Sequence, residues 1–555
     1  MRSKLAANKK WFFVAGIIIL MVAALGTQFA FADGEEEVQQ YFGILSLVPP
    51  VLAIALAVIT KNIVVSLVTS VFVSATIIAG WNPADGFTSM IGTYMFAALA
   101  EDSNMQALFM MTIIAGFVNL LTKSGGANAF TEMVTSKVKS RATCESGIWL
   151  GGLVVWFTDT GNSLIVGPIF EALAEKMRVS REKFSYILDC TTSPICSMIP
   201  IIGWGVTTIQ YIDIELEAAN LSDQMSGMGI FMQAIPFNFY AILTLLMAGF
   251  MSMSQWDYGP MLRAQNRAMK TGETIRPGGT PMRSENNQKI DLPEGYKPKI
   301  STMVIPLVVL LAVIFTYLTL KGMWTTRVAG SDIRTGIASG FICATLALIV
   351  ICLKEKIFSF EKCVSLFTGG CANAMFMCVV LVLSWSLSNV TKAMGTADYL
   401  MEITEGVLAP GLLPCLIFLI GAVMSFATGT SWGTMAILFP IALPLAIGFG
   451  VSLPLVSGAV IGGGLFGDHC SPISDTTILA SIGAACDHID HFETQMPYAC
   501  TVGAVCAVMF LITGWFVTPI MLFVAAAVLI ATIFVLHKVS AKKYGHVKTQ
   551  DGIGA

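Results

Sequence analysis

Long apolar stretches separated by short polar breaks recur from residue 43 to residue 537 of this 555-residue chain. A helix needs about 20 predominantly apolar residues to cross a bilayer, and many of these stretches reach that length. Several stretches are interrupted by polar residues, so the number of crossings is roughly a dozen, give or take two or three. The pattern therefore predicts an all-α polytopic membrane protein.

The composition agrees with this pattern, since 55% of the residues are hydrophobic and only 12% are charged, unlike the balance of a soluble domain. The chain lacks a G-x-x-x-x-G-K-[ST] phosphate loop and an H-E-x-x-H helix motif, so ATP-driven pumping and intramembrane zinc proteolysis are disfavoured. The 13 cysteines show no C-x-x-C spacing and are expected to be small buried hydrophobes. We therefore expect neither an enzyme nor a cofactor, and no nucleic-acid partner.

Residues 1–40 are predicted to be a signal-like or first transmembrane segment. Lys9 and Lys10 precede an apolar run that begins at Trp11, and Ala30 and Ala32 then stand in the A-x-A arrangement of a cleavage site. The apolar run is also long enough to span a membrane, so an uncleaved helix remains an alternative. In both cases the basic end stays in the cytoplasm.

Residues 252–300 divide the remaining chain into two halves. This stretch is rich in Gly, Pro, Asn and charge and has no apolar periodicity, so we expect a flexible cytoplasmic linker. The predicted organisation is an N-terminal transmembrane half at 41–251, the linker, a C-terminal transmembrane half at 301–537 and a cytoplasmic tail at 538–555. The expected location is a bacterial-type inner membrane.

The two halves are similar around their polar breaks. In the first half, FTDTGNSLIVGPIF at 157–170 is followed by an aspartate, Asp189, shortly before the sequence Ser-Pro-Ile. In the second half, FATGTSWGTMAILFP at 426–440 is followed by Asp468, again shortly before Ser-Pro-Ile. The predicted directions across the membrane are opposite, so we interpret the halves as inverted repeats, which are typical of secondary transporters with broken helices. Chance similarity between Gly/Ser-rich membrane helices is the alternative.

Four polar breaks, at 158–162, 191–194, 428–433 and 468–477, are candidate binding segments. Backbone groups that are left free at membrane depth are tolerated only where they are buried in protein or line a cavity. Their side chains are mostly oxygen donors, the ligands that a hard cation such as Na⁺ prefers. The candidate ion- or substrate-binding residues lie at or beside the breaks: Asp159, Thr160, Asn162, Ser163, Asp189, Ser193, Thr428, Ser431, Asp468, His469, Ser471, Ser474, Asp475, Thr476 and Thr477. Sodium is the only metal expected at these residues.

The aspartates carry the strongest chemical argument. No Lys or Arg occurs between Lys392 and Lys538, the stretch that contains Asp468 and Asp475. A charged aspartate at the centre of a membrane helix costs on the order of 3 kcal/mol. Because burial raises the pKa of a carboxylate and a bound cation lowers it, Na⁺ and H⁺ can compete for one such site. The alternative is that these acids are structural and pair with Arg or Lys from the other half.

A second polar cluster, CDHIDH at 486–491, contains Asp487, His488, Asp490 and His491. These side chains are plausible ligands of a transition metal, which leaves a membrane metalloprotein as an alternative. The position of the cluster before the next apolar run favours a gate or a pH-sensing role instead, as a cytoplasmic cap, a proton-entry funnel or a pH-sensing loop.

The stretch GDHCSPISDTTILASIGAACDHIDHFETQMPYA at 467–499 resembles the NhaC-type sodium/proton antiporter family of the ion transporter superfamily, as do TDTGNSLIVGPI and DCTTSPIC. The resemblance implies an elevator-like, dimeric carrier with inverted repeats, hairpins and broken helices that exchanges Na⁺ for H⁺. The family also includes carriers of organic acids, and related carriers handle amino acids. The segment before residue 40 and the long linker depart from the family's compact layout.

Our hypothesis is a secondary transporter that exchanges Na⁺ for H⁺. Asp468 and Asp475 would act in one broken helix, and Asp189, with Asp159, in its inverted counterpart. The alternative is a Na⁺-coupled carrier or exchanger of an organic acid of the malate/lactate type, or of an amino acid, since the N-terminus of a broken helix can hold a carboxylate without Arg.

Overall fold

The computed structural model describes residues 42–60, 62–126, 129, 138–282, 292–293, 296–322, 330–396, 398–399, 402, 409–472 and 474–545. Every regular element within these ranges is a helix, which confirms the prediction of an all-α protein. The predicted N-terminal segment at 1–40 lies outside the described residues, as do residues 546–555 of the predicted tail.

The first half contains helices that differ widely in length, and short helices alternate with long ones. They are η1 (Gly43–Leu47), α2 (Val48–Thr60), α3 (Ile63–Ile78), α4 (Pro83–Ser89), η2 (Met90–Phe96), α5 (Ala97–Ala100), α6 (Asp102–Lys123), α8 (Arg141–Val154), α9 (Asp159–Lys176), α10 (Arg181–Cys190), α11 (Ser193–Cys196), α12 (Gly203–Ala218), α13 (Gly227–Ala234), η3 (Ile235–Phe237), α14 (Phe239–Ser254) and α15 (Gly259–Thr271).

The second half has the same mixture of long and interrupted helices. They are α16 (Ser301–Leu320), α17 (Gly330–Lys354), α18 (Phe360–Asn373), α19 (Met375–Ala393), η4 (Pro410–Leu412), α21 (Leu413–Thr428), α22 (Ser431–Gly448), α23 (Leu453–His469), α24 (Asp475–Gly483), α25 (His488–Thr513) and α26 (Met521–Tyr544). Helix α26 runs past the expected start of the tail at residue 538.

The described chain has nine helices that are long and apolar enough to cross a membrane, or ten if one bent pair counts as a single span. The bent pair joins Val64–Ile78 to Pro83–Ala100 at an angle of 119°. The protein is therefore a multi-pass membrane protein. The count lies at the low end of the expected number because several apolar stretches form short helices that end at polar breaks.

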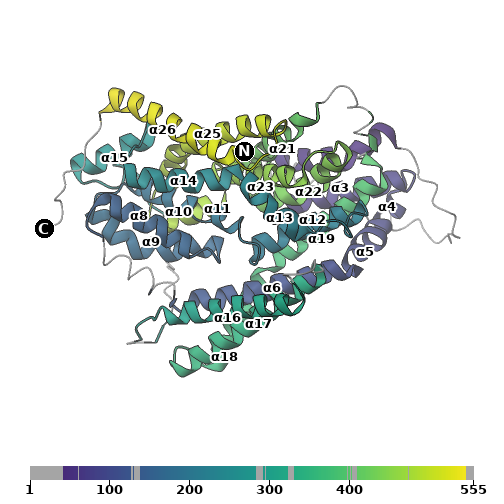
Figure 1. The fold of residues 1–555 in the computed structure, drawn as a ribbon, viewed down its shortest axis with the longest axis horizontal. Coiled ribbons are helices and arrows are strands. Elements are labelled where there is room, and N and C mark those ends of the chain that lie inside the picture. Colours follow the sequence, from purple (N-terminus) through teal and green to yellow (C-terminus); the bar gives the residue numbers. More distant parts are fainter. Residues whose placement is uncertain are drawn as a thin grey trace, which may run out of the picture.

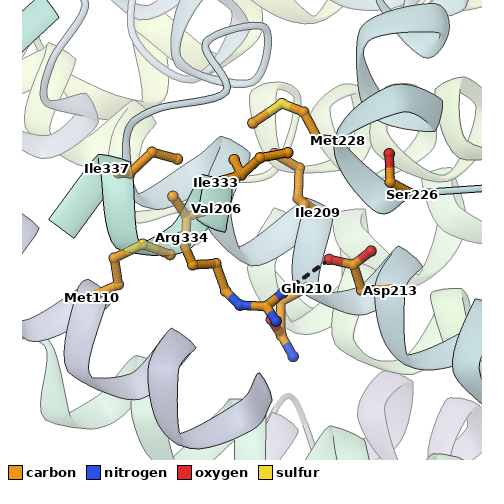
Figure 2. A pocket seen from close by; sticks show the side chains of 10 residues that line it. All are labelled: Met110, Val206, Ile209, Gln210, Asp213, Ser226, Met228, Ile333, Arg334 and Ile337. Carbon is orange, nitrogen blue, oxygen red and sulfur yellow. Dashed lines mark hydrogen bonds and ion pairs between the residues drawn. The ribbon is translucent and has the colours of Figure 1, made fainter. Parts of the chain in front are cut away.

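Four helices form a separate layer along the lower edge of the molecule in Figure 1. These helices are α6, α16, α17 and α18, and they pack on one another. An ion pair between Arg334 Nη1 of α17 and Asp213 Oδ2 of α12, 3.3 Å apart, joins this layer to the helices above it (Figure 2). Arg334 Nε also donates to Gln106 of α6 at 2.9 Å. The layer is thus tied to the rest of the molecule by polar contacts.

The predicted flexible linker contains a packed helix, α15, so that interpretation is wrong for residues 259–271. Met261, Leu262 and Ala268 are buried, and Gln265 accepts a hydrogen bond from the backbone of Ser180 at 3.1 Å. The buried residues of α15 recur at helical spacing, and the charged Arg263 and Lys270 are exposed. This short amphipathic pattern is concealed when the composition of residues 252–300 is taken as a whole. The central part of the linker, residues 283–291, lies outside the described residues.

A buried ion pair holds α10 against the start of this segment. Lys183 Nζ pairs with Asp257, and both side chains are almost fully buried. Tyr498 of α25 also donates its hydroxyl to Asp257 at 3.0 Å. Since an unpaired buried charge is far more costly than a paired one, this contact fixes three parts of the chain together.

We predict that Asp257→Asn destabilises the protein by about 3–5 kcal/mol, because it leaves the Lys183 ammonium buried without its carboxylate. Thermal unfolding of the detergent-purified chain measures the effect. The matched control is Asp332→Asn, which breaks an exposed pair with Lys321 and should leave the unfolding midpoint nearly unchanged. Equal midpoints for the two variants would contradict the prediction.

Candidate ion-binding site

All four breaks predicted from the sequence are present. Two of them, between α8 and α9 and between α21 and α22, are turns whose last residue is a threonine cap. Thr158 accepts from Gly161 N and Thr430 accepts from Gly433 N, so each hydroxyl caps the helix that follows. A proline follows ten residues after each cap, Pro168 in α9 and Pro440 in α22. The α8–α9 and α21–α22 turns, with the helices that follow them, are therefore built in the same way.

The other two breaks follow an aspartate at the penultimate position of a helix. Helix α10 ends at Cys190, directly after Asp189, and α11 begins at Ser193. Helix α23 ends at His469, directly after Asp468, and α24 begins at Asp475. In both cases the chain breaks within a few residues of a buried carboxylate.

Asp189 is fully buried and contacts residues from the second half of the chain. Its Oδ2 accepts hydrogen bonds from Thr477 Oγ1 at 3.0 Å and from Gln495 Nε2 at 2.6 Å. The Nε2 atoms of His469 and His491 lie 3.8 and 4.0 Å from the same oxygen. Its Oδ1 has no hydrogen-bond partner among the described residues.

Asp468 is only 4% exposed. Its Oδ2 accepts a hydrogen bond from Ser431 of α22 at 2.7 Å, and its Oδ1 is left without a partner among the described residues. No lysine or arginine in the described chain pairs with Asp468 or with Asp189. The alternative that these acids are paired with basic residues across the fold therefore does not hold for the described residues.

Three further predicted residues carry a buried oxygen without a hydrogen-bond partner in the described structure. The atoms are Asn162 Oδ1, Ser163 Oγ and Ser193 Oγ. The amide nitrogen of Asn162 is occupied, since it donates to Gly152 O and Thr191 O at 2.7 and 2.9 Å. Buried polar atoms are nearly always satisfied, and each exception costs about 1–3 kcal/mol. Buried oxygens without hydrogen-bond partners are donors of the kind that a hard cation binds.

Other predicted hydroxyls are engaged in local structure. Thr428 donates to Met424 O at 2.9 Å, and Ser471 donates to Phe426 O at 2.8 Å. Ser474 caps α24 through Thr477 N and also contacts Thr476 Oγ1 at 3.0 Å. These hydroxyls stabilise the turns at the breaks, and their oxygens keep lone pairs available to a cation. The side chain of Thr160 lies outside the described structure.

Asp159 and Asp475 lie at the starts of α9 and α24. Asp159 Oδ2 accepts from Trp204 Nε1 at 2.8 Å, while Asp475 Oδ1 accepts from the backbone of Thr476 at 2.9 Å. The charge of Asp475 repels those of Asp159 and Asp468. All four candidate aspartates therefore belong to one electrostatic neighbourhood.

His469 and two residues that the sequence reasoning missed complete the surroundings of Asp189. Gln495 donates to both Asp189 Oδ2 and His469 O, and Tyr240 OH lies 2.8 Å from His469 Nδ1. Gln495 lies two residues before Pro497, which stands inside α25, and Tyr240 is the second residue of α14. Their contacts depend on how distant helices pack, which the local sequence does not indicate.

The CDHIDH cluster forms the start of α25 rather than a loop. Asp487 is the N-cap and accepts from Ile489 N and Thr280 N, at 2.9 and 2.8 Å. Although burial opposes it, these backbone hydrogen bonds hold the pKa of Asp487 below its usual value. Asp490 pairs with Arg276 at 2.8 Å. The acids and the histidines have different partners, and the described residues contain no group of three or more His, Cys, Asp or Glu placed to hold a metal ion.

The two histidines of the cluster share one serine. Ser481 Oγ lies 3.1 Å from His488 Nδ1 and 2.9 Å from His491 Nδ1. His488 Nε2 faces Pro472 O, and His491 Nε2 faces the oxygen of Gln495, so both Nε2 atoms must donate. In neutral imidazoles both Nδ1 atoms are then acceptors, yet the Ser481 hydroxyl has a single proton. The hydroxyl also lies 2.8 Å from Thr477 O, to which it donates, so three acceptors surround its single proton.

These helices, breaks and unpaired carboxylates define a class of protein: a multi-pass secondary transporter rather than an enzyme. Residues 195–515 match the Na⁺/H⁺ antiporter family. The chain belongs to that family, which confirms the resemblance to NhaC-type antiporters.

Relatives of the chain include proteins with different cargo. An uncharacterized protein of Haemophilus influenzae is 30% identical over 510 residues, 89% of this chain and 95% of that protein. The malate-2H(+)/Na(+)-lactate antiporter of Bacillus subtilis is 29% identical over 158 residues, 28% of this chain and 34% of its own. The Na(+)/H(+) antiporter NhaC of Alkalihalophilus pseudofirmus is 25% identical over 135 residues, 24% and 28% of the two chains.

Among solved structures, the YdaH transporter of Alcanivorax borkumensis covers 79% of this chain and 90% of its own, at 13% identity and a TM-score of 0.49.

The contact between α9 and α24 depends on two glycines. A Cβ at Gly167 would lie 2.2 Å from Gly483 O, so Gly167→Ala should push α24 away from α9. We expect a clear fall in the thermal unfolding midpoint of the purified chain. Gly92→Ala is the control, because a Cβ there meets nothing within 4 Å. An unchanged midpoint for Gly167→Ala would contradict the close packing.

Proposed function

We propose that the chain exchanges Na⁺ for H⁺. The observation that carries this proposal is the pair of buried carboxylates, Asp189 and Asp468. Each has one oxygen that lacks a hydrogen-bond partner in the described structure, and neither is paired with a lysine or arginine there. A buried carboxylate of this kind is stabilised either by a bound cation or by a proton. Competition between the two at a site that opens to each side in turn is antiport.

In this proposal Na⁺ binds at Asp468, where Ser431 lies within hydrogen-bond distance. Asn162, Ser163 and Ser193 supply further oxygens from the first half. The driving force needs no nucleotide, since one charge moved across 100 mV is worth about 2.3 kcal/mol.

The proton is proposed to reach Asp189 through the histidines of α25. His488, Ser481 and His491 form one hydrogen-bonded series, and His491 Nε2 lies 4.0 Å from Asp189 Oδ2. His488 is half-buried whereas His491 is fully buried, so the series runs from a more accessible group to an inaccessible one.

We also propose that the two halves are inverted repeats that move in an elevator-like manner. The matched threonine caps, the prolines ten residues later and the penultimate aspartates support a common origin of the two halves. The dimer implied by the family resemblance stays a prediction.

A second candidate function is Na⁺-coupled transport or exchange of an organic acid or amino acid. The observation that favours it is a cavity of about 510 Å³ beside Asp159 and Asp475, a volume within the range of about 300–1,000 Å³ for small-molecule sites.

Proteoliposomes that contain a pH-sensitive dye separate the two functions. Added Na⁺, without any organic solute, should move protons if the chain is an Na⁺/H⁺ antiporter. If Na⁺ alone moves no protons while an organic acid or amino acid is taken up, simple exchange is wrong.

In the same assay Asp468→Asn should abolish the response to Na⁺, because the neutral amide cannot balance the charge of the ion. Asp332→Asn, at an exposed ion pair of α17, is the matched control and should respond like the original chain. Full activity of Asp468→Asn would remove Asp468 from the site.

Ser481→Ala tests the proton route. It removes the atom that both imidazoles contact, so proton movement should slow at least roughly tenfold, equivalent to about 1.4 kcal/mol. Equilibrium binding of ²²Na⁺ to the purified variant should be retained. Ser226→Ala, which removes a cap of α13, is the control. An unchanged rate in Ser481→Ala would exclude this route.

A further inference from the structure

The cavity beside the breaks is lined by both halves of the chain. Its walls include Thr158 and Asp159 of the first half and Thr430 and Asp475 of the second, together with residues of α6 and the α18–α19 junction. A dehydrated cation among its oxygen ligands needs no such volume. The cavity also reaches the break that follows Asp468, because Asp475, the first residue of α24, lines it.

The acidic side chains give the cavity a negative balance of charge. Asp159 and Asp475 both line it, and Lys123 is the basic residue among the described lining. Asp475 is exposed, and no lysine or arginine of the described chain pairs with it. An organic anion would meet two carboxylates against one ammonium, whereas an organic cation would relieve their repulsion.

A pair of tryptophans stands beside these carboxylates, one from each half. The ring centroids of Trp204 and Trp432 are 4.5 Å apart at an angle of 47°, and both residues line the cavity. Trp204 Nε1 donates a hydrogen bond to Asp159 Oδ2 at 2.8 Å, which positions the carboxylate next to the rings. Tryptophan is the best aromatic partner of an ammonium group, and aromatic rings with acids recognise quaternary ammonium ligands.

We infer that the cavity binds a small organic compound that carries an ammonium group, held by Asp159, Asp475 and the Trp204–Trp432 pair. Asn119, Asn373 and Lys123 line the same cavity and provide polar contacts for the rest of the molecule. This inference rests on the second candidate function above and narrows its substrate to compounds that carry an ammonium group, as amino acids do, rather than organic acids. The ammonium compound and Na⁺ would then be coupled through the repulsion between Asp475 and Asp468.

Binding to the detergent-purified full chain, followed by calorimetry and by tryptophan fluorescence, tests the inference without any transport. The probes are choline and 1,4-diaminobutane, with their neutral counterparts 3,3-dimethyl-1-butanol and 1,4-butanediol, and succinate as an organic anion. We expect at least one ammonium probe to bind tenfold or more tightly than its neutral counterpart. Equal binding of charged and neutral probes, preferential binding of succinate, or no binding of any ammonium probe would overturn the inference.

Two variants and one control locate the binding. Asp475→Asn and Trp432→Phe should each lower the affinity for the ammonium probe by roughly tenfold. Asp332→Asn should leave that affinity unchanged. If neither cavity variant weakened binding, the probe would bind elsewhere, which would contradict the inference. The binding result and the Na⁺/H⁺ exchange assay are independent. Exchange without ammonium binding would contradict this inference only, and ammonium binding without exchange would contradict the first function only.

Discussion

A carboxylate buried inside the protein without a lysine or arginine partner is the constraint on which the rest of this site depends. Asp189 and Asp468 are both buried and need polar contacts from the protein, whereas a continuous helix uses its own backbone groups internally. The chain meets this need by ending helices beside them. Ser431, Thr477 and Gln495 then reach the carboxylates from neighbouring helices.

No lysine or arginine of the described chain pairs with Asp189 or Asp468. Elsewhere the same fold buries basic side chains with partners. Lys183 is paired with Asp257, and Arg181 contacts Glu175 at 2.7 Å and is 2% exposed. The structure thus contains buried charge pairs that join helices and, apart from these, buried carboxylates without a lysine or arginine partner among the described residues.

Local sequence predicted the breaks well because their chemistry is local. Threonine, glycine, serine and proline beside an aspartate indicate a helix end without any knowledge of the fold, and the helices begin and end at those residues. Contacts between distant segments could not be predicted in this way. The roles of Gln495, Tyr240 and Trp204 depend on which helices pack together. The helix α15 was missed because its short amphipathic pattern lies within a stretch whose overall composition is polar.

The distance along the chain between Asp189 and its partners has a consequence for how the protein is made. Thr477 and Gln495 follow Asp189 by 288 and 306 residues. During synthesis the first half therefore enters the membrane with this carboxylate still lacking both hydrogen bonds, and α10 cannot reach its final environment until α24 and α25 have been inserted. The order of translation thus makes assembly of the ion site one of the last steps of biogenesis, after most of the chain has already been committed to the bilayer.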